Sequence, residues 1–163
     1  MREILFRGKR VDNGEWIEGY LLNHEQKYYI CNNCSDISYG DNGNRIRFGC
    51  WYEVIPETVG QYTGLTANGA KIFEGDIVRD LEKYLFHKGL FERGYKNQEN
   101  YEEYRTNGNV AEVKYDTEDC GSCGCCFPLF EGAGFIAEDI KFSCCEIIGN
   151  IHDNPELVRG EEE

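Results

Sequence analysis

The cysteines are the residues of this sequence whose type and spacing could do chemistry. Four of the nine form two Cys-x-x-Cys pairs, Cys31 with Cys34 and Cys120 with Cys123. Two residues between thiols let both sulfurs bind one ion, so two such pairs could complete a tetrahedral, structural zinc site. The pairs are 85 residues apart, whereas paired zinc knuckles are usually separated by about 15–20 residues. The pattern therefore leaves two alternatives, a structural zinc site or unligated thiols with no cofactor.

Three further cysteines lie in strand-like surroundings. Cys50 precedes a tryptophan, and Cys144 and Cys145 precede an aliphatic run. Neighbouring strand residues face opposite sides of a sheet, so we expect at least one of the adjacent pair to pack in a core. A redox role for a Cys-x-x-Cys pair would need a thioredoxin-like βαβ setting, which this sequence lacks.

No set of catalytic residues is recognisable, and we expect the protein not to be an enzyme. The three histidines, His24, His87 and His152, are scattered and are expected to have surface or capping roles. Asp76 follows a glycine, where an aspartate usually makes local hydrogen bonds in a turn. The glycine-rich motifs of nucleotide-binding proteins and the nucleophile motif of hydrolases are absent from the sequence.

Asn-Gly dipeptides indicate the elements that must position these residues. They occur at Asn13-Gly14, Asn42-Gly43, Asn68-Gly69 and Asn107-Gly108, each followed within a few residues by a strand-like run. Asn and Gly tolerate the positive φ angles of tight hairpin turns, so each dipeptide predicts such a turn. Short strands joined by tight turns favour a mainly β sandwich or small barrel.

One segment interrupts this β pattern. At residues 80–105, Leu81, Tyr84 and Leu85 have helical spacing behind Asp80, a candidate N-cap, before Gly89 and Gly94 interrupt. We therefore predict a partly helical insertion there. A Cys- and Gly-rich stretch at residues 116–134 predicts a second loop.

Charge and composition limit the partners and the compartment. With 17 Lys and Arg against 30 Asp and Glu, the net charge is −13, which repels nucleic acid and anionic membranes. The first residues contain no apolar stretch typical of a signal peptide. We therefore expect a cytoplasmic protein with reduced thiols. The acidic residues 160–163 are expected to be a solvated tail.

Three stretches together resemble one known family. They are the opening Met1-Arg2-Glu3-Ile4 with Phe6-Arg7-Gly8-Lys9-Arg10 and Asn13-Gly14-Glu15-Trp16, the central residues 56–78 (PETVGQYTGLTANGAKIFEGDIV), and the ending 147–157 (IIGNIHDNPEL). In this order they are similar to the YopX-like proteins of phages and prophages. The resemblance implies a β-rich fold with a small SH3-like barrel in a bacterial host cell, and it implies no activity.

These patterns give one domain at residues 1–159. It would comprise an N-terminal β region (1–55), a barrel region (56–79 and 110–154) and the insertion (80–109). The glycines and aliphatic residues of the family stretches are typical of backbone and core positions, so we interpret these stretches as architectural.

The first functional hypothesis is a non-catalytic accessory protein that acts through protein contacts, with self-association as one form. Trp16, Trp51 or the tyrosines of the insertion would make those contacts. The alternative is a nucleic-acid-related protein, either a binder through Arg7, Lys9 and Arg10 or an acidic mimic. A zinc-stabilised β module is the third. Metal analysis with a thiol count tests it, because nine reactive thiols without metal would exclude the Cys₄ site.

Overall fold

The computed structural model describes residues 3–32, 38–39, 46–47, 50–95, 101–116, 127–130, 133–137 and 140–158. The chain divides into two compact units, Met1–Gly64 and Leu65–Glu163. Each unit has its own cluster of buried apolar side chains.

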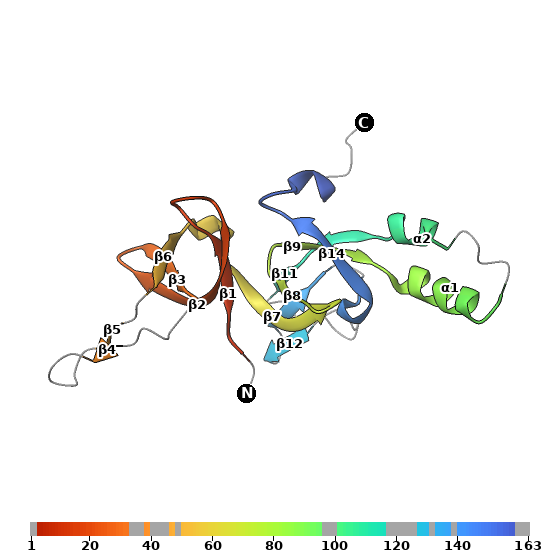
Figure 1. Cartoon of the computed structure of the whole chain (residues 1–163), viewed down its shortest axis with the longest axis horizontal. Helices are drawn as coiled ribbons and strands as arrows, with labels where there is room; N and C mark the ends of the chain where they lie inside the picture. Colours follow the sequence, from red (N-terminus) through yellow and green to blue (C-terminus); the bar gives the residue numbers. More distant parts are fainter. Residues whose placement is uncertain are drawn as a thin grey trace. The chain divides into compact units, whose positions relative to one another are not determined.

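The first unit is an antiparallel sheet (Figure 1). Its strands are β1 (Phe6–Lys9), β2 (Trp16–His24), β3 (Lys27–Cys31) and β6 (Trp51–Val54), in the order β6-β3-β2-β1, followed by the start of β7 (Gly60–Ala67). Ile17, Ile30 and Val54 are buried on one face of this sheet. A two-stranded ribbon, β4 (Ser38–Tyr39) with β5 (Ile46–Arg47), and a 3-10 turn at Pro56–Thr58 complete the unit.

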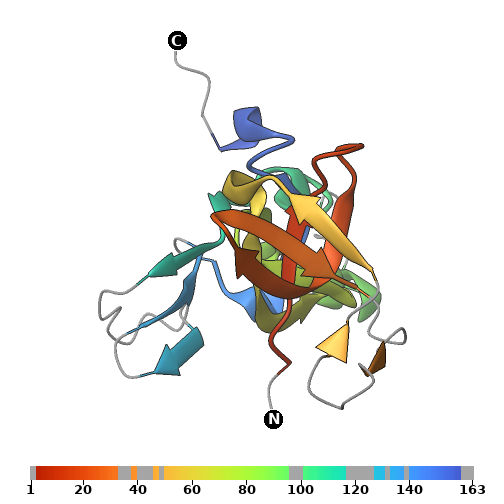
Figure 2. The ribbon, with the colours of Figure 1, turned by 90° about the vertical axis from the view of Figure 1, so that its left-hand side faces the viewer.

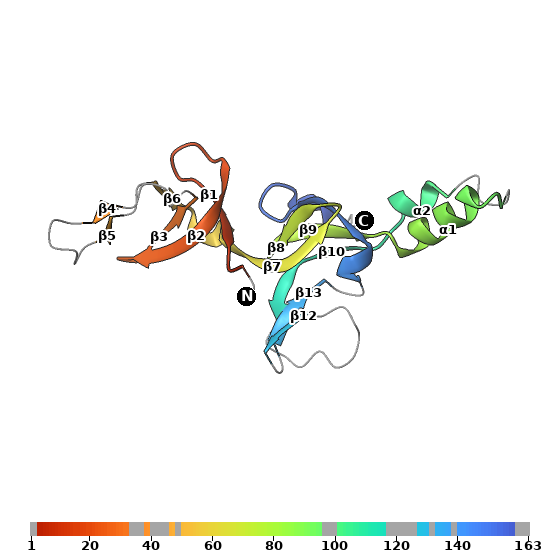
Figure 3. The same cartoon turned by 60° about the horizontal axis from the view of Figure 1, so that its bottom comes forward.

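The second unit contains two three-stranded antiparallel sheets. β10 (Val110–Glu112), β9 (Asp76–Asp80) and β14 (Cys145–Asn150) form one, and β11 (Lys114–Asp116), β13 (Ala133–Ile136) and β12 (Phe127–Phe130) form the other. Figures 2 and 3 show the sheet of β11, β13 and β12 projecting from the rest of this unit. β8 (Ala70–Phe73) follows β7, and short 3-10 helices cover Phe142–Cys144 and Pro155–Leu157.

The apolar core of the second unit combines side chains from the beginning and the end of this unit's sequence. Ala67, Ile72, Val78, Ala111 and Cys145, from β7, β8, β9, β10 and β14, pack in one buried cluster. Val113, Ala137, Ile140 and Phe142 join the same cluster. β7, β8, β9, β10 and β14 therefore share one core although they belong to two different sheets.

The mainly β prediction is confirmed, with antiparallel sheets and a short helical segment. The strand pairs of the described residues include no closed barrel. The predicted loop at residues 116–134 is wrong in part, because β12 and β13 pair there. No helix in the described ranges is long and apolar enough to cross a membrane.

One of the four predicted tight Asn-Gly turns is confirmed, and a second dipeptide connects paired strands without forming the tight turn. Asn68-Gly69 connects β7 to β8 with both φ angles positive, 49° and 85°, as a tight hairpin turn requires. Asn13-Gly14 lies in a longer loop between the paired strands β1 and β2, where Gly14 has a φ of 72°. Asn42-Gly43 lies outside the described residues.

The prediction of a hairpin turn at Asn107-Gly108 is wrong. This dipeptide ends a helix, α2 (Glu103–Thr106), and leads into β10. A Cβ atom on Gly108 would lie 2.1 Å from the carbonyl oxygen of Asp80. The glycine is therefore required by close approach of two backbones rather than by a turn.

The insertion is partly helical, as predicted, and its two helices form an arm that leaves the ends of β9 and β10 (Figures 1 and 3). α1 (Glu82–Glu92) begins where Asp80 Oδ1 accepts a hydrogen bond from the Glu82 amide at 2.9 Å. The prediction that Gly89 interrupts the helix is wrong, because α1 continues through this residue. Gly94, with a φ of 89°, follows the helix end.

One hairpin turn has no signal in the sequence. Glu25 and Gln26 connect β2 to β3 with φ angles of 49° and 64°. Neither residue favours this left-handed conformation, which costs roughly 1–2 kcal/mol per residue for side chains with a Cβ.

Replacing Gln26 by glycine should therefore stabilise the protein. We expect Gln26→Gly to raise the free energy of unfolding by about 0.5–1 kcal/mol, because relief of the φ strain exceeds the entropy that glycine adds to the unfolded chain. Urea denaturation measures the change. The control Gly69→Ala should lower stability, and a loss of stability in Gln26→Gly would contradict the turn geometry.

Candidate functional site

The central and C-terminal family stretches meet at a buried aspartate. Asp76 begins β9 and is 1% exposed. Its Oδ2 accepts a hydrogen bond from the Phe73 amide at 2.7 Å, and its Oδ1 lies 3.4 Å from the donor Nδ2 of Asn150. The first bond closes the turn between β8 and β9, which confirms the prediction that Asp76 makes local hydrogen bonds.

Backbone hydrogen bonds tie the same turn to two other segments. Gly75 donates to the Val113 carbonyl at 2.8 Å, and Val113 donates to the Asp76 carbonyl at 2.8 Å. Ile151 donates to the Gly75 carbonyl at 2.9 Å. The Asp76 turn, defined as residues 73–76, is thus joined to the chain at residues 113 and 150–151.

A β-bulge sets the position of Asn150. Ile147 pairs with Val78 and Gly149 pairs with Ile77, so Ile148 is an extra residue on β14. The bulge brings Asn150 opposite Asp76. The Asn150 Oδ1 in turn accepts the His152 amide at 3.0 Å, which orders the following turn.

Asp76 and Asn150 are both buried. The hydrogen bonds described above join Asp76 to the Phe73 amide and to Asn150, and join Asn150 to the His152 amide. His152 is exposed at the edge, with Nε2 3.8 Å from a Cβ built on Gly75. Gly75 itself has a φ of 81°, which glycine adopts without strain.

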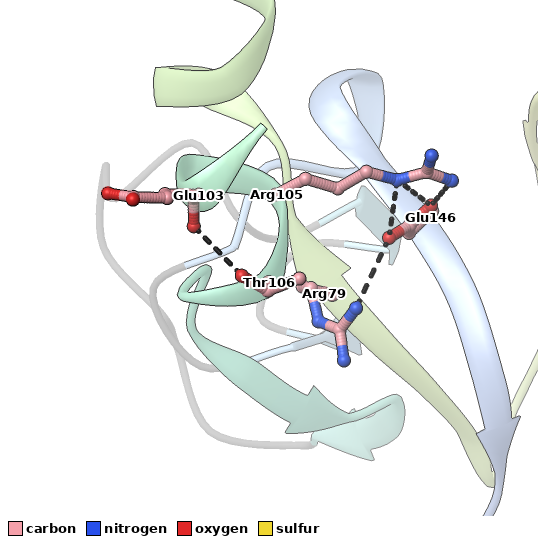
Figure 4. A network of polar contacts seen from close by, with 5 residues as sticks. All are labelled: Arg79, Glu103, Arg105, Thr106 and Glu146. Carbon is pink, nitrogen blue, oxygen red and sulfur yellow. Dashed lines mark hydrogen bonds and ion pairs between the residues drawn. The ribbon is translucent and has the colours of Figure 1, made fainter. Parts of the chain in front are cut away.

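Three charged side chains connect the arm to the sheet of β10, β9 and β14 (Figure 4). Glu146 of β14 is 9% exposed and binds Arg105 of α2 at 2.7 Å and Arg79 of β9 at 3.5 Å. Hydrogen bonding to Glu146 raises the pKa of the Arg105 guanidinium. Removing one partner would leave a largely buried charge uncompensated, which is costly.

The first residues of the arm, 81–84, also contact residues outside α1. Leu81 is buried, and its amide donates to the Cys144 carbonyl at 2.7 Å. Glu82 forms an exposed ion pair with Lys141 at 2.9 Å. Tyr84 is buried and lies beside Tyr101, with ring centroids 5.7 Å apart. These contacts hold the start of α1 in place.

Aromatic side chains fill the space between the two helices of the arm. Phe91 lies 5.3 Å from Tyr101, and the His87 ring stacks on Tyr104 at 4.4 Å. The opposite side of α1 presents Leu85 (44% exposed) and Phe86 (64% exposed). We call the residues Glu82, Leu85, Phe86, Gly89 and Arg93 the outer face of α1.

The predicted zinc ligands are described only in part. Cys31 is buried in β3, whereas Cys34, Cys120 and Cys123 lie outside the described residues. Within the described ranges, no three His, Cys, Asp or Glu side chains form a group that could hold a metal. The Cys₄ site stays a prediction.

The adjacent cysteines Cys144 and Cys145 follow the packing expectation. Cys145 is buried in the core of the second unit and Cys144 is partly exposed, so one member of the adjacent pair packs inward as expected. Burial raises the pKa of the Cys145 thiol to about 11. Because a thiolate is the reactive form, Cys145 is a poor nucleophile.

The histidines and basic residues are dispersed. His24 is exposed beside Glu25, and His87 belongs to the aromatic stack of the arm. Arg7 and Lys9 lie over the Trp16 ring, 4.7 and 5.3 Å from its centroid. Arg10 lies over Tyr52 and pairs with Asp12, and this pairing lowers the pKa of the Asp12 carboxyl.

Sequence reasoning missed the roles of Asn150, Glu146 and Arg105. Polar residues are numerous in an acidic chain, and nothing in their local pattern indicates which are buried. Glu146 does lie in an otherwise apolar run, Cys144-Cys145-Glu146-Ile147-Ile148. A charge within such a run is a signal that could have indicated a buried ion pair.

Removing the Asp76 carboxylate should destabilise the second unit. We expect Asp76→Ala to lower the free energy of unfolding by about 2–3 kcal/mol, because the Phe73 amide and the Asn150 side chain lose a buried acceptor. Chemical denaturation monitored by circular dichroism measures this loss. Asp76→Asn keeps one acceptor oxygen and should cost less. Equal stability of Asp76→Ala and the unmodified protein would contradict this assignment.

Neutralising Glu146 should loosen the arm. In Glu146→Gln, Arg105 loses its charged partner, so we expect the amides of α2 to exchange with deuterium about tenfold faster, with the β-sheet amides little changed. Hydrogen–deuterium exchange with mass spectrometry measures this. The matched control is Glu112→Gln, which removes a more exposed pair with Lys114. Identical exchange of α2 in both variants would refute the anchoring role of Glu146.

A comparison with known protein families agrees with the resemblance of the three stretches. The family described as YopX protein matches residues 5–159. A crystal structure of protein EF1440 from Enterococcus faecalis is similar at 20% identity and a TM-score of 0.48, covering 97% of this chain and 99% of that one. No match was found among curated proteins. Because the family match covers nearly the whole chain, the protein belongs to the YopX protein family.

Proposed function

We propose that this protein is a non-catalytic accessory protein that acts through protein–protein contacts made by the outer face of α1. The observation that carries the proposal is the exposure of Leu85 and Phe86 on a helix whose other side is already packed. Neighbouring large apolar side chains on a helix typically mark a surface that another protein covers.

The anchoring of the arm supports this proposal. The Arg105–Glu146 pair, the Glu82–Lys141 pair and the buried Leu81 hold the two helices against the sheet. A surface that is fixed in advance loses less conformational entropy when a partner binds. The exposed side chains are thus presented on an ordered support.

The charge of the arm favours the same surface. Residues 82–106 contain five Lys and Arg and five Asp and Glu, for a net charge of zero in a chain of net charge −13. An acidic or neutral protein is therefore repelled less by the arm than by the rest of the chain.

We further infer that the strands of the second unit close into a small SH3-like barrel. The core shared by β7, β8, β9, β10 and β14 supports this arrangement. A phage or prophage origin and a site of action in the bacterial cytoplasm belong to the same proposal, supported by the family and by the number of cysteines.

Nucleic-acid binding is the second candidate function, favoured by the stacking of Arg7 and Lys9 on Trp16. Cations beside an aromatic ring could contact single-stranded nucleic acid. The net charge of −13 opposes it. A gel shift with single-stranded DNA or RNA that is lost in Trp16→Ala would favour this function over the first.

Site-specific photo-crosslinking in the expressing cell tests the proposed contact surface. With benzoylphenylalanine in place of Phe86, we expect discrete protein adducts that are lost when Leu85→Ser is added. The control carries the same photoreactive residue at Val11, an exposed position of the first unit. Absence of protein adducts at position 86, or the same adducts at position 11, would contradict the proposal.

A further inference from the structure

Gly89 has an unusual place in the arm. It lies inside α1, although glycine is among the poorest helix formers. A Cβ atom built on Gly89 would meet nothing within 4 Å in the described part of the chain. Neither a turn nor close packing within the described chain therefore explains this glycine.

Four of the five residues on the outer face of α1 have a symmetric order. At about 100° per residue, the five members of this face fall within an arc of about 100°. Glu82 stands at one end and Arg93 just past the other, with Phe86 and Gly89 between them. The pair Glu82 and Arg93 and the pair Phe86 and Gly89 have the same midpoint along the helix, so reversing the helix exchanges the members of each pair.

We propose that α1 pairs in antiparallel orientation with α1 of a second copy of this chain. In this register Phe86 of each copy lies over Gly89 of the other, and Glu82 of each faces Arg93 of the other. The glycine provides the open position that a large aromatic side chain needs at a close helix–helix contact. The proposal rests on the proposed function and identifies the partner of the same surface.

The charges favour this pairing. Two copies, each of net charge −13, repel one another in most orientations, whereas the arm carries no net charge. Arg93 is exposed and has no ion pair among the described residues. Glu82 binds Lys141 but is itself exposed, and a carboxylate can accept from a second cation.

The contact is small. A single pair of 11-residue helices buries less surface than a standard stable interface, so we expect weak association, on the order of 10–100 μM. Because the two helices are related by a twofold axis, the Phe86–Gly89 contact and the Glu82–Arg93 contact each occur twice in the dimer.

Sedimentation equilibrium tests the proposal over a concentration range from about 5 to 300 μM. The unmodified chain should change from 18.8 kDa toward twice that mass as its concentration rises. Arg93→Glu places two carboxylates opposite each other, and Glu82→Arg places two cations opposite each other. Each variant alone should therefore associate at least about tenfold more weakly.

Mixing the two variants provides the decisive measurement. A heterodimer of Arg93→Glu with Glu82→Arg restores an opposite-charge pair at both ends, so association should return in the mixture. Lys83→Glu is the matched control for Arg93→Glu, since it makes the same charge change on α1 outside the outer face. It should associate like the unmodified chain.

Gly89→Ala separates folding from association. The added methyl group meets nothing within 4 Å among the described residues, so the melting temperature should rise while dimerisation weakens at least about tenfold. A chain that stays monomeric throughout, or association unaffected by Arg93→Glu, would overturn the proposed dimer. In either case, adducts of other proteins at position 86 would still support the proposed function.

Discussion

The buried Asp76 carboxylate fixes the turn on which the second unit depends. Its bond to the Phe73 amide closes the connection between β8 and β9. Its contact with Asn150 aligns the end of β14 with the start of β9. A buried carboxylate is costly unless it is hydrogen-bonded, so this turn tolerates few alternatives. The Asp76 turn, residue 113 and residues 150–151, which are distant in the sequence, are thereby held in fixed positions relative to one another.

The arm depends on that register. β9 begins at Asp76 and ends at Asp80, whose side chain accepts from the first turn of α1. β14, held opposite β9, carries the Glu146 that binds Arg105 of α2. The position of the two helices therefore follows from the same sheet. An ordered arm with exposed Leu85 and Phe86 is the basis for the proposed protein contacts.

Local chemistry predicted the elements better than it predicted their partners. The turn at Asn68-Gly69 was predicted correctly because both residues adopt the positive φ angles that the dipeptide favours. Glu25-Gln26 adopts the same conformation under the constraint of β2 and β3, which local preference does not reveal. Gly89 remained in a helix because an isolated glycine weakens a helix without ending it.

The candidate site shows the same limit. The family stretches around residues 73–76 and 149–154 were recognisable, and Asp76 was expected in a turn. Their meeting depends on the bulge at Ile148 and on a strand pairing between residues 65 to 74 positions apart. The link between Glu146 and Arg105 is also non-local. Such pairings follow from the whole fold, which a single sequence does not specify by local pattern.

Native-state hydrogen exchange followed by NMR tests most directly whether the Asp76 turn is the centre of the second unit. The amides of Gly75, Val113 and Ile151 each donate to a backbone carbonyl at this junction. We predict that they exchange only through global unfolding, with a denaturant dependence equal to that of complete unfolding. Exchange of these three amides through local opening, while the remaining sheet amides stay protected, would contradict this account.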